Sequence, residues 1–124
     1  MEITPQIPQG RQVIESYGPG RFRIAGVPHG GSVLVFPERT LAWPVAAMAA
    51  LSEADLAPVI AAEPRVEILL IGCGPALVPV PPALRAALRA YGIGCDAMDT
   101  GAACRTFNVL LAESRRVAAA LIAL

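Results

Sequence analysis

Apolar and polar positions alternate in the first third of the chain. Phe22 and Ile24 are each preceded by an arginine, and the turn Gly18-Pro19-Gly20 joins this run to a mixed segment at residues 12–17. Alternation around a glycine- and proline-containing turn predicts a β-hairpin with one half-buried face.

The next segments are short and apolar. A strand is expected at residues 32–36 and an extended piece at 41–43, whereas the Pro- and Gly-rich residues 27–31 are expected to form a loop. Ser52 is a good N-cap for a helix that reaches about residue 62, although a proline inside this segment argues against one straight helix.

The second half has the pattern of a βαβ unit. A continuous apolar run at residues 66–71 predicts a strand covered on both faces, and residues 94–98 predict the next strand. Pro81 and Pro82 open a helix between them that ends at Gly92. Its buried stripe is expected to contain Leu84, Leu88 and Tyr91. The two strands should therefore run parallel.

A third helix follows, at about residues 102–113, with Asp99 or Thr100 as its cap. Its expected apolar face contains Ala103, Phe107, Leu110 and Leu111. The final segment, residues 115–124, has two possible structures, because its alanines favour helix while its short apolar run also fits a buried strand.

Composition restricts the class of protein. The 124 residues are 55% apolar and 16% charged, which supports one packed domain over residues 1–124 and excludes general disorder. Ten arginines balance ten acidic residues, so nucleic-acid binding is not expected. Residues 1–10 lack the pattern of a signal peptide, and four prolines interrupt the longest uncharged run, so we expect a cytoplasmic protein without an integral membrane segment.

The supply of ligand-forming residues argues against cofactors. Cys73, Cys95 and Cys104 form no C-x-x-C pair and are expected to be free thiols, and His29 is the only histidine. We therefore expect no metal site. Gly72 and Gly74 lack the third glycine of a dinucleotide fingerprint, so no nucleotide cofactor is expected either.

Two loops are expected at the carboxyl ends of the parallel strands, where open α/β sheets bind ligands. Gly72-Cys73-Gly74 follows one strand and Asp99-Thr100-Gly101 follows the next. Backbone N–H groups there could hold an anion, with Asp99 as a base or hydroxyl-binding group. Alternatively, both loops are only tight strand-to-helix turns, and Asp99 is only the helix cap.

The third helix adds polar residues to this edge. Cys104, Arg105 and Asn108 share one side of it, and they could form either the wall of a cleft or a buried hydrogen-bond network. Cys104 could be a reactive thiol near a helix N-terminus or a small buried apolar residue. No catalytic residue is assigned. The candidate binding residues are Gly72, Cys73, Gly74, Asp99, Thr100, Cys104, Arg105, Asn108, Glu113 and Arg115.

Residues 98–122 form a distinctive sequence motif. Shorter motifs precede it in the chain: Tyr17-Gly18-x-Gly20-x-Phe22, residues 31–35 with Trp43, and Ile71-Gly72-x-Gly74. Together these motifs resemble the Mth938-like family of unknown function, which includes the mitochondrial complex I assembly factor 3. The resemblance implies a three-layer α/β fold with a central mixed sheet, helices and an additional β-hairpin layer. It also implies that residues 116–122 form a strand, antiparallel to the others.

The resemblance carries no established enzyme activity. It indicates a non-enzymatic binding or assembly module with a protein partner, and we expect this module to aid the biogenesis of a respiratory membrane complex. The alternative is an enzyme or small-ligand binder that uses the cleft at the carboxyl ends of the parallel strands.

Overall fold

A computed structural model of the chain describes residues 10–124. The expectation that residues 1–10 are not a signal peptide therefore concerns a segment that lies, except for Gly10, outside the described residues. The strands are β1 (Ile14–Gly18), β2 (Arg21–Ile24), β3 (Val27–Gly30), β4 (Val33–Val35), β5 (Thr40–Ala42), β6 (Ile68–Gly72), β7 (Gly94–Met98) and β8 (Val117–Leu121). The α-helices are α1 (Ala57–Ile60), α2 (Pro82–Ala90) and α3 (Thr100–Ala112), and two 3₁₀ turns, η1 (Met48–Ala50) and η2 (Glu53–Leu56), precede α1.

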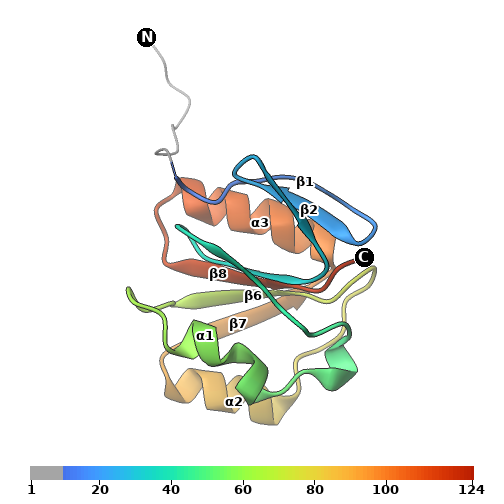
Figure 1. The fold of residues 1–124 in the computed structure, drawn as a ribbon. Coiled ribbons are helices and arrows are strands. Elements are labelled where there is room, and N and C mark those ends of the chain that lie inside the picture. Colours follow the sequence, from blue (N-terminus) through green and yellow to red (C-terminus); the bar gives the residue numbers. More distant parts are fainter. Residues whose placement is uncertain (1–9) are drawn as a thin grey trace.

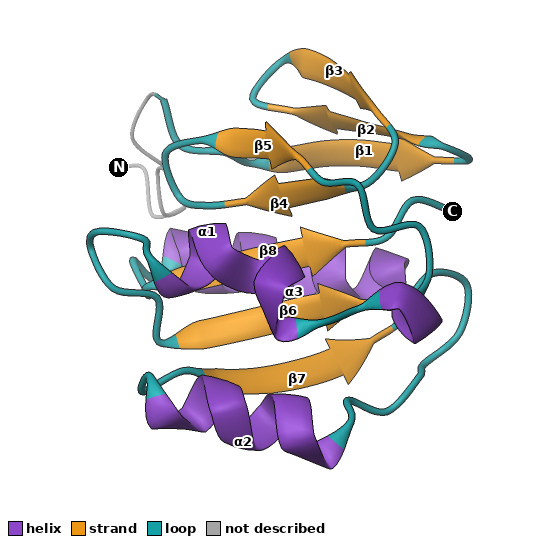
Figure 2. Ribbon diagram, turned by 60° about the horizontal axis from the view of Figure 1, so that its bottom comes forward, coloured by secondary structure: helices purple, strands orange, loops and turns teal. Residues whose placement is uncertain are grey.

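The expected three-layer α/β fold is confirmed. A central five-stranded mixed sheet has the order β5-β4-β8-β6-β7, with α1 and α2 on one side and α3 with the sheet β1-β2-β3 on the other (Figure 1). β6 and β7 are parallel, as the βαβ pattern predicted, and they run side by side with α2 next to β7 (Figure 2).

The direction expected for the final strand was wrong in part. β8 is antiparallel to β4 but parallel to β6, where Ile68 is opposite Val117 and Gly72 is opposite Leu121. The reason is the connection through α3, which carries the chain from the carboxyl end of β7 back to the amino end of the sheet. A strand that follows such a helical crossover runs in the same direction as the strand before it.

The additional layer is a three-stranded sheet, because the segment expected to be a loop after β2 forms β3. Ala25 and Gly26 both have positive φ, 50° and 79°, as a two-residue hairpin turn requires. Pro28 is tolerated because β3 is an edge strand. Alanine is not a usual residue at such a turn, so residues 25–26 carry little signal of a hairpin.

The central strands are buried on both faces. Along β8, Val117, Ala119 and Leu121 pack with α3 and the three-stranded sheet, whereas Ala118 and Ala120 belong to the core on the side of α1 and α2. This double burial explains why an alanine-rich segment forms a strand here despite its helix propensity.

Two helix predictions need correction. The helix expected from Ser52 to about residue 62 is η2 followed by the single turn of α1, with Pro58 in the first turn of α1. Tyr91 is not in the buried stripe of α2: it follows the last helical residue and is 46% exposed, and Gly92 then ends the helix with a φ of 80°.

Candidate functional site

The two loops predicted at the carboxyl ends of β6 and β7 contact each other directly. The Thr100 hydroxyl accepts a hydrogen bond from the Gly74 N–H (2.8 Å) and donates one to the Ile122 carbonyl (2.7 Å). The Thr100 N–H donates in turn to the Gly74 carbonyl (2.9 Å). Thr100 is completely buried, so hydrogen bonds within the chain close this edge of the sheet.

The other loop residues join the same network. The Cys73 N–H donates to the Met98 carbonyl (2.8 Å), and the Ile122 N–H donates to the Gly72 carbonyl (2.9 Å). A Cβ atom on Gly72 would lie 3.0 Å from the Thr100 Cα, so any larger residue would require the Thr100 backbone to shift by a few tenths of an ångström. The loops therefore connect β6, β7 and the segment after β8.

Asp99 is the helix cap, one of the two residues that the sequence allowed for that position, and Thr100 is the first residue of α3. The Asp99 Oδ1 accepts a hydrogen bond from the Ala102 N–H (2.9 Å) at the first turn of α3. Cys104, one turn further along α3, is 2% exposed. Burial raises the pKa of its thiol to about 12, more than the Arg105 charge lowers it. Since the thiolate is the nucleophilic form, these surroundings suit a small buried residue rather than a reactive thiol.

Arg105 and Asn108 contact β1 rather than the loops. The Arg105 guanidinium donates to the Tyr17 hydroxyl (2.7 Å). The Asn108 side chain is half-buried and accepts from the Ile14 N–H (2.9 Å) and donates to the Ile14 carbonyl (2.8 Å). Asn108 thus pairs with one residue of β1 as a neighbouring strand would.

The remaining two candidates lie at the other end of α3. Glu113 lies fourteen positions after Asp99, which corresponds to about 20 Å along a helix axis. Glu113 and Arg115 are exposed there. The structure therefore brings together Gly72, Cys73, Gly74, Asp99 and Thr100, places Arg105 and Asn108 against β1, and separates Glu113 and Arg115 from all of them.

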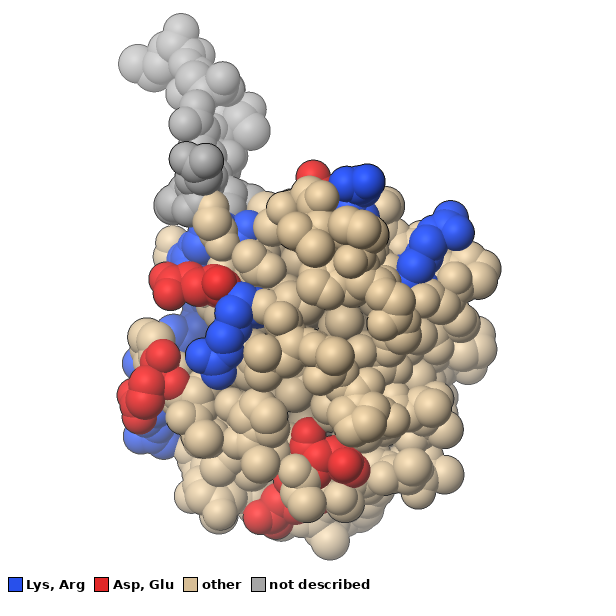
Figure 3. All heavy atoms as spheres, viewed as in Figure 1, with Lys and Arg blue, Asp and Glu red and all other residues tan. Residues whose placement is uncertain are grey.

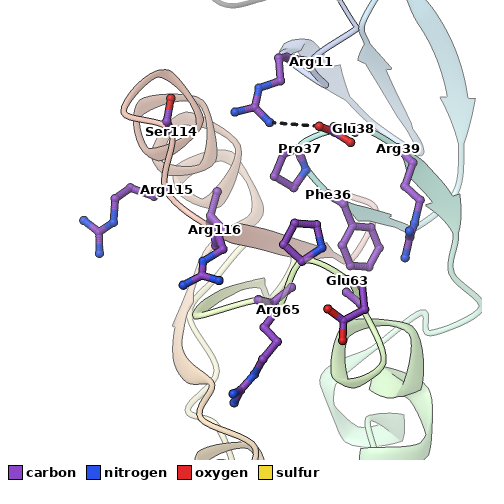
Figure 4. A pocket seen from close by; sticks show the side chains of 14 residues that line it. Arg11, Phe36, Pro37, Glu38, Arg39, Glu63, Arg65, Ser114, Arg115 and Arg116 are labelled. Carbon is purple, nitrogen blue, oxygen red and sulfur yellow. Dashed lines mark ion pairs between the residues drawn. The ribbon is translucent and has the colours of Figure 1, made fainter.

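Arg115 instead lines a hollow that the sequence reasoning missed, at the amino ends of β6 and β8 (Figure 4). We call it the amino-end hollow. It has a volume of about 410 Å³ and is formed by Arg11 and by residues 36–39, 62–66 and 114–117. In Figure 3 charged side chains of both signs gather at this edge of the molecule, on the left, while most of the face in view is uncharged. No local motif marks these residues, because they come from four separate segments.

Three further properties concern the described residues. Within residues 10–124, no helix has the length and apolar character needed to span a bilayer. In the same range, no three His, Cys, Asp or Glu side chains are grouped as metal ligands would be. The three cysteines are buried and unpaired.

Comparison with known proteins gives relatives along almost the whole chain. An uncharacterised protein of Rhodobacter capsulatus is 40% identical over 113 residues, which cover 91% of this chain and 86% of that protein. The NADH dehydrogenase [ubiquinone] 1 alpha subcomplex assembly factor 3 of Danio rerio is 36% identical over 110 residues, 89% of this chain but 63% of that longer protein. A solution structure of a Bordetella pertussis Mth938-like domain superposes with a TM-score of 0.81 at 28% identity, over 99% of this chain and 92% of that one.

The sequence profile of a family described as protein of unknown function (DUF498/DUF598) matches residues 14–122, from the first residue of β1 to the residue after β8. This range includes both loops of the Thr100 network and all of α3. The chain belongs to this DUF498/DUF598 family and has its Mth938-like fold, which confirms the resemblance stated from the sequence.

Proposed function

We propose that this chain is a non-enzymatic binding module that assists the assembly of a membrane-bound respiratory complex through a protein partner. Relatives of 33–38% identity named as complex I assembly factor 3 support the assembly role. The chain spans only 63% of the Danio rerio protein. The role and partners of that longer protein are therefore proposed for this chain and do not follow from the similarity alone.

The main support for a non-enzymatic role is that the polar side chains expected to line a cleft already form hydrogen bonds within the chain. Asp99 caps α3, Arg105 binds the Tyr17 hydroxyl and Asn108 uses both ends of its amide on Ile14. A cleft that binds substrate needs polar groups free to face it. Groups that already hold the fold together favour the module over the small-ligand alternative at this edge.

A partner surface is available beside the closed loops. Leu77 is 61% exposed and Val78 is 40% exposed, and both follow Gly74 in the loop that leads to α2. Adjacent exposed apolar side chains next to a rigid network suit the centre of a protein interface.

Affinity capture tests the proposal. The tagged chain is expressed in its native cells, and its partners are identified by mass spectrometry in parallel with the double variant Leu77→Glu and Val78→Glu. Val109→Glu is the control, because Val109 is an apolar residue on α3 that is 58% exposed, close to the exposure of Leu77. We expect subunits of a respiratory complex with the parent and the control, and their loss with the double variant. Capture of the same subunits by the double variant would exclude this surface, and their absence from every sample would exclude the assembly role.

A further inference from the structure

The loop that carries Leu77 and Val78 is part of a larger uncharged surface. Residues 68–84 form the longest uncharged run of the chain, and residues 40–52 also contain no charged residue. The first run includes β6 and the loop after it, and the second includes β5 and the segment after it. The ends of β5 and β6 align through β4 and β8 with the same end of the central sheet.

Two segments beyond these strand ends expose apolar residues only. Five residues are exposed in segment 44–50 and eight in segment 75–83, and every one of these thirteen is Ala, Pro, Leu or Val. Met48 and Val80, buried members of the two segments, belong to the same core cluster. Figures 1 and 2 both show η1 beside the loop that joins β6 to α2. We call the exposed residues of these two segments the uncharged loop surface.

Prolines make this surface unsuitable for a partner strand. Pro75, Pro79, Pro81 and Pro82 have no N–H group, and residues 75–81 form no helix or strand. An extended partner would therefore find few backbone donors in this loop. A partner helix needs none, because its own turns satisfy its backbone groups and it binds through the side chains of one face.

The residue types of the surface select an uncharged partner face. A charged side chain placed against either segment would lose water without meeting an opposite charge, which weakens binding strongly. The four alanines at positions 46, 47, 49 and 50 allow a helix to approach closely. Leu77 and Val78, 61% and 40% exposed, supply the larger apolar side chains of the contact.

The size of the surface suits one helix rather than a folded domain. Each partner in a standard protein interface contributes roughly 20–30 residues. The thirteen exposed residues of the uncharged loop surface fall short of that number. A second copy of this chain, seated on this surface alone, would therefore be held weakly.

A lipid bilayer also fits less well than a helix. Proteins that bind membrane surfaces use basic side chains and exposed aromatic rings as anchors, and neither segment contains such a residue. The neighbouring Trp43 is 5% exposed, and its indole N–H donates to the Asp55 carbonyl (2.8 Å), so it is turned into the protein.

We propose that the uncharged loop surface binds a single helix of the partner protein through an uncharged, apolar helical face. The helix contacts both segments, with Leu77 and Val78 packed against its apolar side chains. This inference rests on the proposed function, because it names the class of partner segment that the surface around Leu77 receives.

Two synthetic peptides test the proposal in an NMR titration of the ¹⁵N-labelled full chain. The first is a helix of about 18 residues, about 27 Å long, with Ala and Leu on one face and equal numbers of Glu and Lys on the other. The second has the same composition rearranged so that no apolar face forms. We expect the first to bind with a submillimolar Kd and at least about tenfold more tightly than the second. The shifted amide resonances should belong to the two segments.

One variant in each segment assigns the contact. Ala47→Glu and Leu77→Glu should each weaken binding of the first peptide at least about tenfold, because each buries an unpaired charge. Val109→Glu, at an exposed apolar position on α3 outside both segments, should leave binding unchanged. Thermal melting confirms that each variant is folded.

Several results would overturn the inference: equal binding of the rearranged peptide, unchanged binding by both segment variants, equal weakening by Val109→Glu, or no response at millimolar peptide. Cosedimentation with vesicles of phosphatidylcholine, with and without phosphatidylglycerol, that is lost in the segment variants would instead identify a bilayer as the partner. The titration uses no respiratory subunit. Its failure therefore overturns only the helix, whereas affinity capture without respiratory subunits overturns the assembly role.

Discussion

Replacement of Asn108 by leucine should destabilise the domain, although leucine is the better helix former. The two hydrogen bonds from the Asn108 amide satisfy both the N–H and the carbonyl of Ile14, at 2.9 and 2.8 Å. Loss of the amide leaves both backbone groups unpaired at a half-buried position, and an unpaired buried group costs about 1–3 kcal/mol. Leucine recovers less than about 0.7 kcal/mol through helix propensity.

The expected net loss for Asn108→Leu is therefore about 2 kcal/mol in the free energy of unfolding, toward the low end of the range because the site is only half-buried. Urea denaturation followed by circular dichroism measures it. Val109→Leu is the control at the next position, where the side chain is 58% exposed, and a change within about 0.5 kcal/mol is expected. If Asn108→Leu is neutral or stabilising while partner or ligand binding disappears, Asn108 is a functional residue, and the small-ligand alternative gains support.

Three further changes test the closed loop network and its surroundings. Thr100→Val should lower the free energy of unfolding by about 2–4 kcal/mol, because it leaves the buried Gly74 N–H and Ile122 carbonyl without the hydroxyl as a hydrogen-bond partner. Thr100→Ser keeps the hydroxyl and should cost less, and thermal melting curves compare the two variants. Gly72→Ala should lower the melting temperature, because its Cβ would lie 3.0 Å from the Thr100 backbone, and an unchanged melting temperature would contradict the packing described. Burial raises the pKa of the Cys104 thiol to about 12, so the thiol loses its proton at a lower pH in the unfolded chain than in the folded one, and the free energy of unfolding should fall as the pH rises from about 9 toward 12. Cys104→Ala should show a smaller fall, since the buried Cys95, whose pKa is also raised, contributes equally to both proteins.

The second half of the chain could be predicted closely because its signals are local. The strand predicted at residues 94–98 is β7 with the same bounds. The cap of α3 is Asp99, one of the two residues that the sequence allowed. The direction of β8 could not be predicted from periodicity, because an apolar run looks the same in a parallel and an antiparallel pair. It depends on how α3 returns the chain across the sheet.

The candidate site could be predicted only in part for a similar reason. The meeting of the Gly72 and Asp99 loops follows from the general rule for parallel strands, but the engagement of Asn108 with β1 depends on a contact between residues 94 positions apart. The amino-end hollow is more distant still from any sequence signal. Arg11 and Arg39 lie in separate segments, and each is one of ten arginines that composition alone does not distinguish.

Deletion of the gene in its native host tests the proposed assembly role most directly. The amount of assembled respiratory complex in membranes is measured by native gel electrophoresis, with NADH oxidation as an independent readout. We predict a clear loss of assembled complex in the deletion strain, restored by the parent chain and not by the Leu77→Glu and Val78→Glu double variant. An unchanged amount of assembled complex in the deletion strain would contradict the proposal.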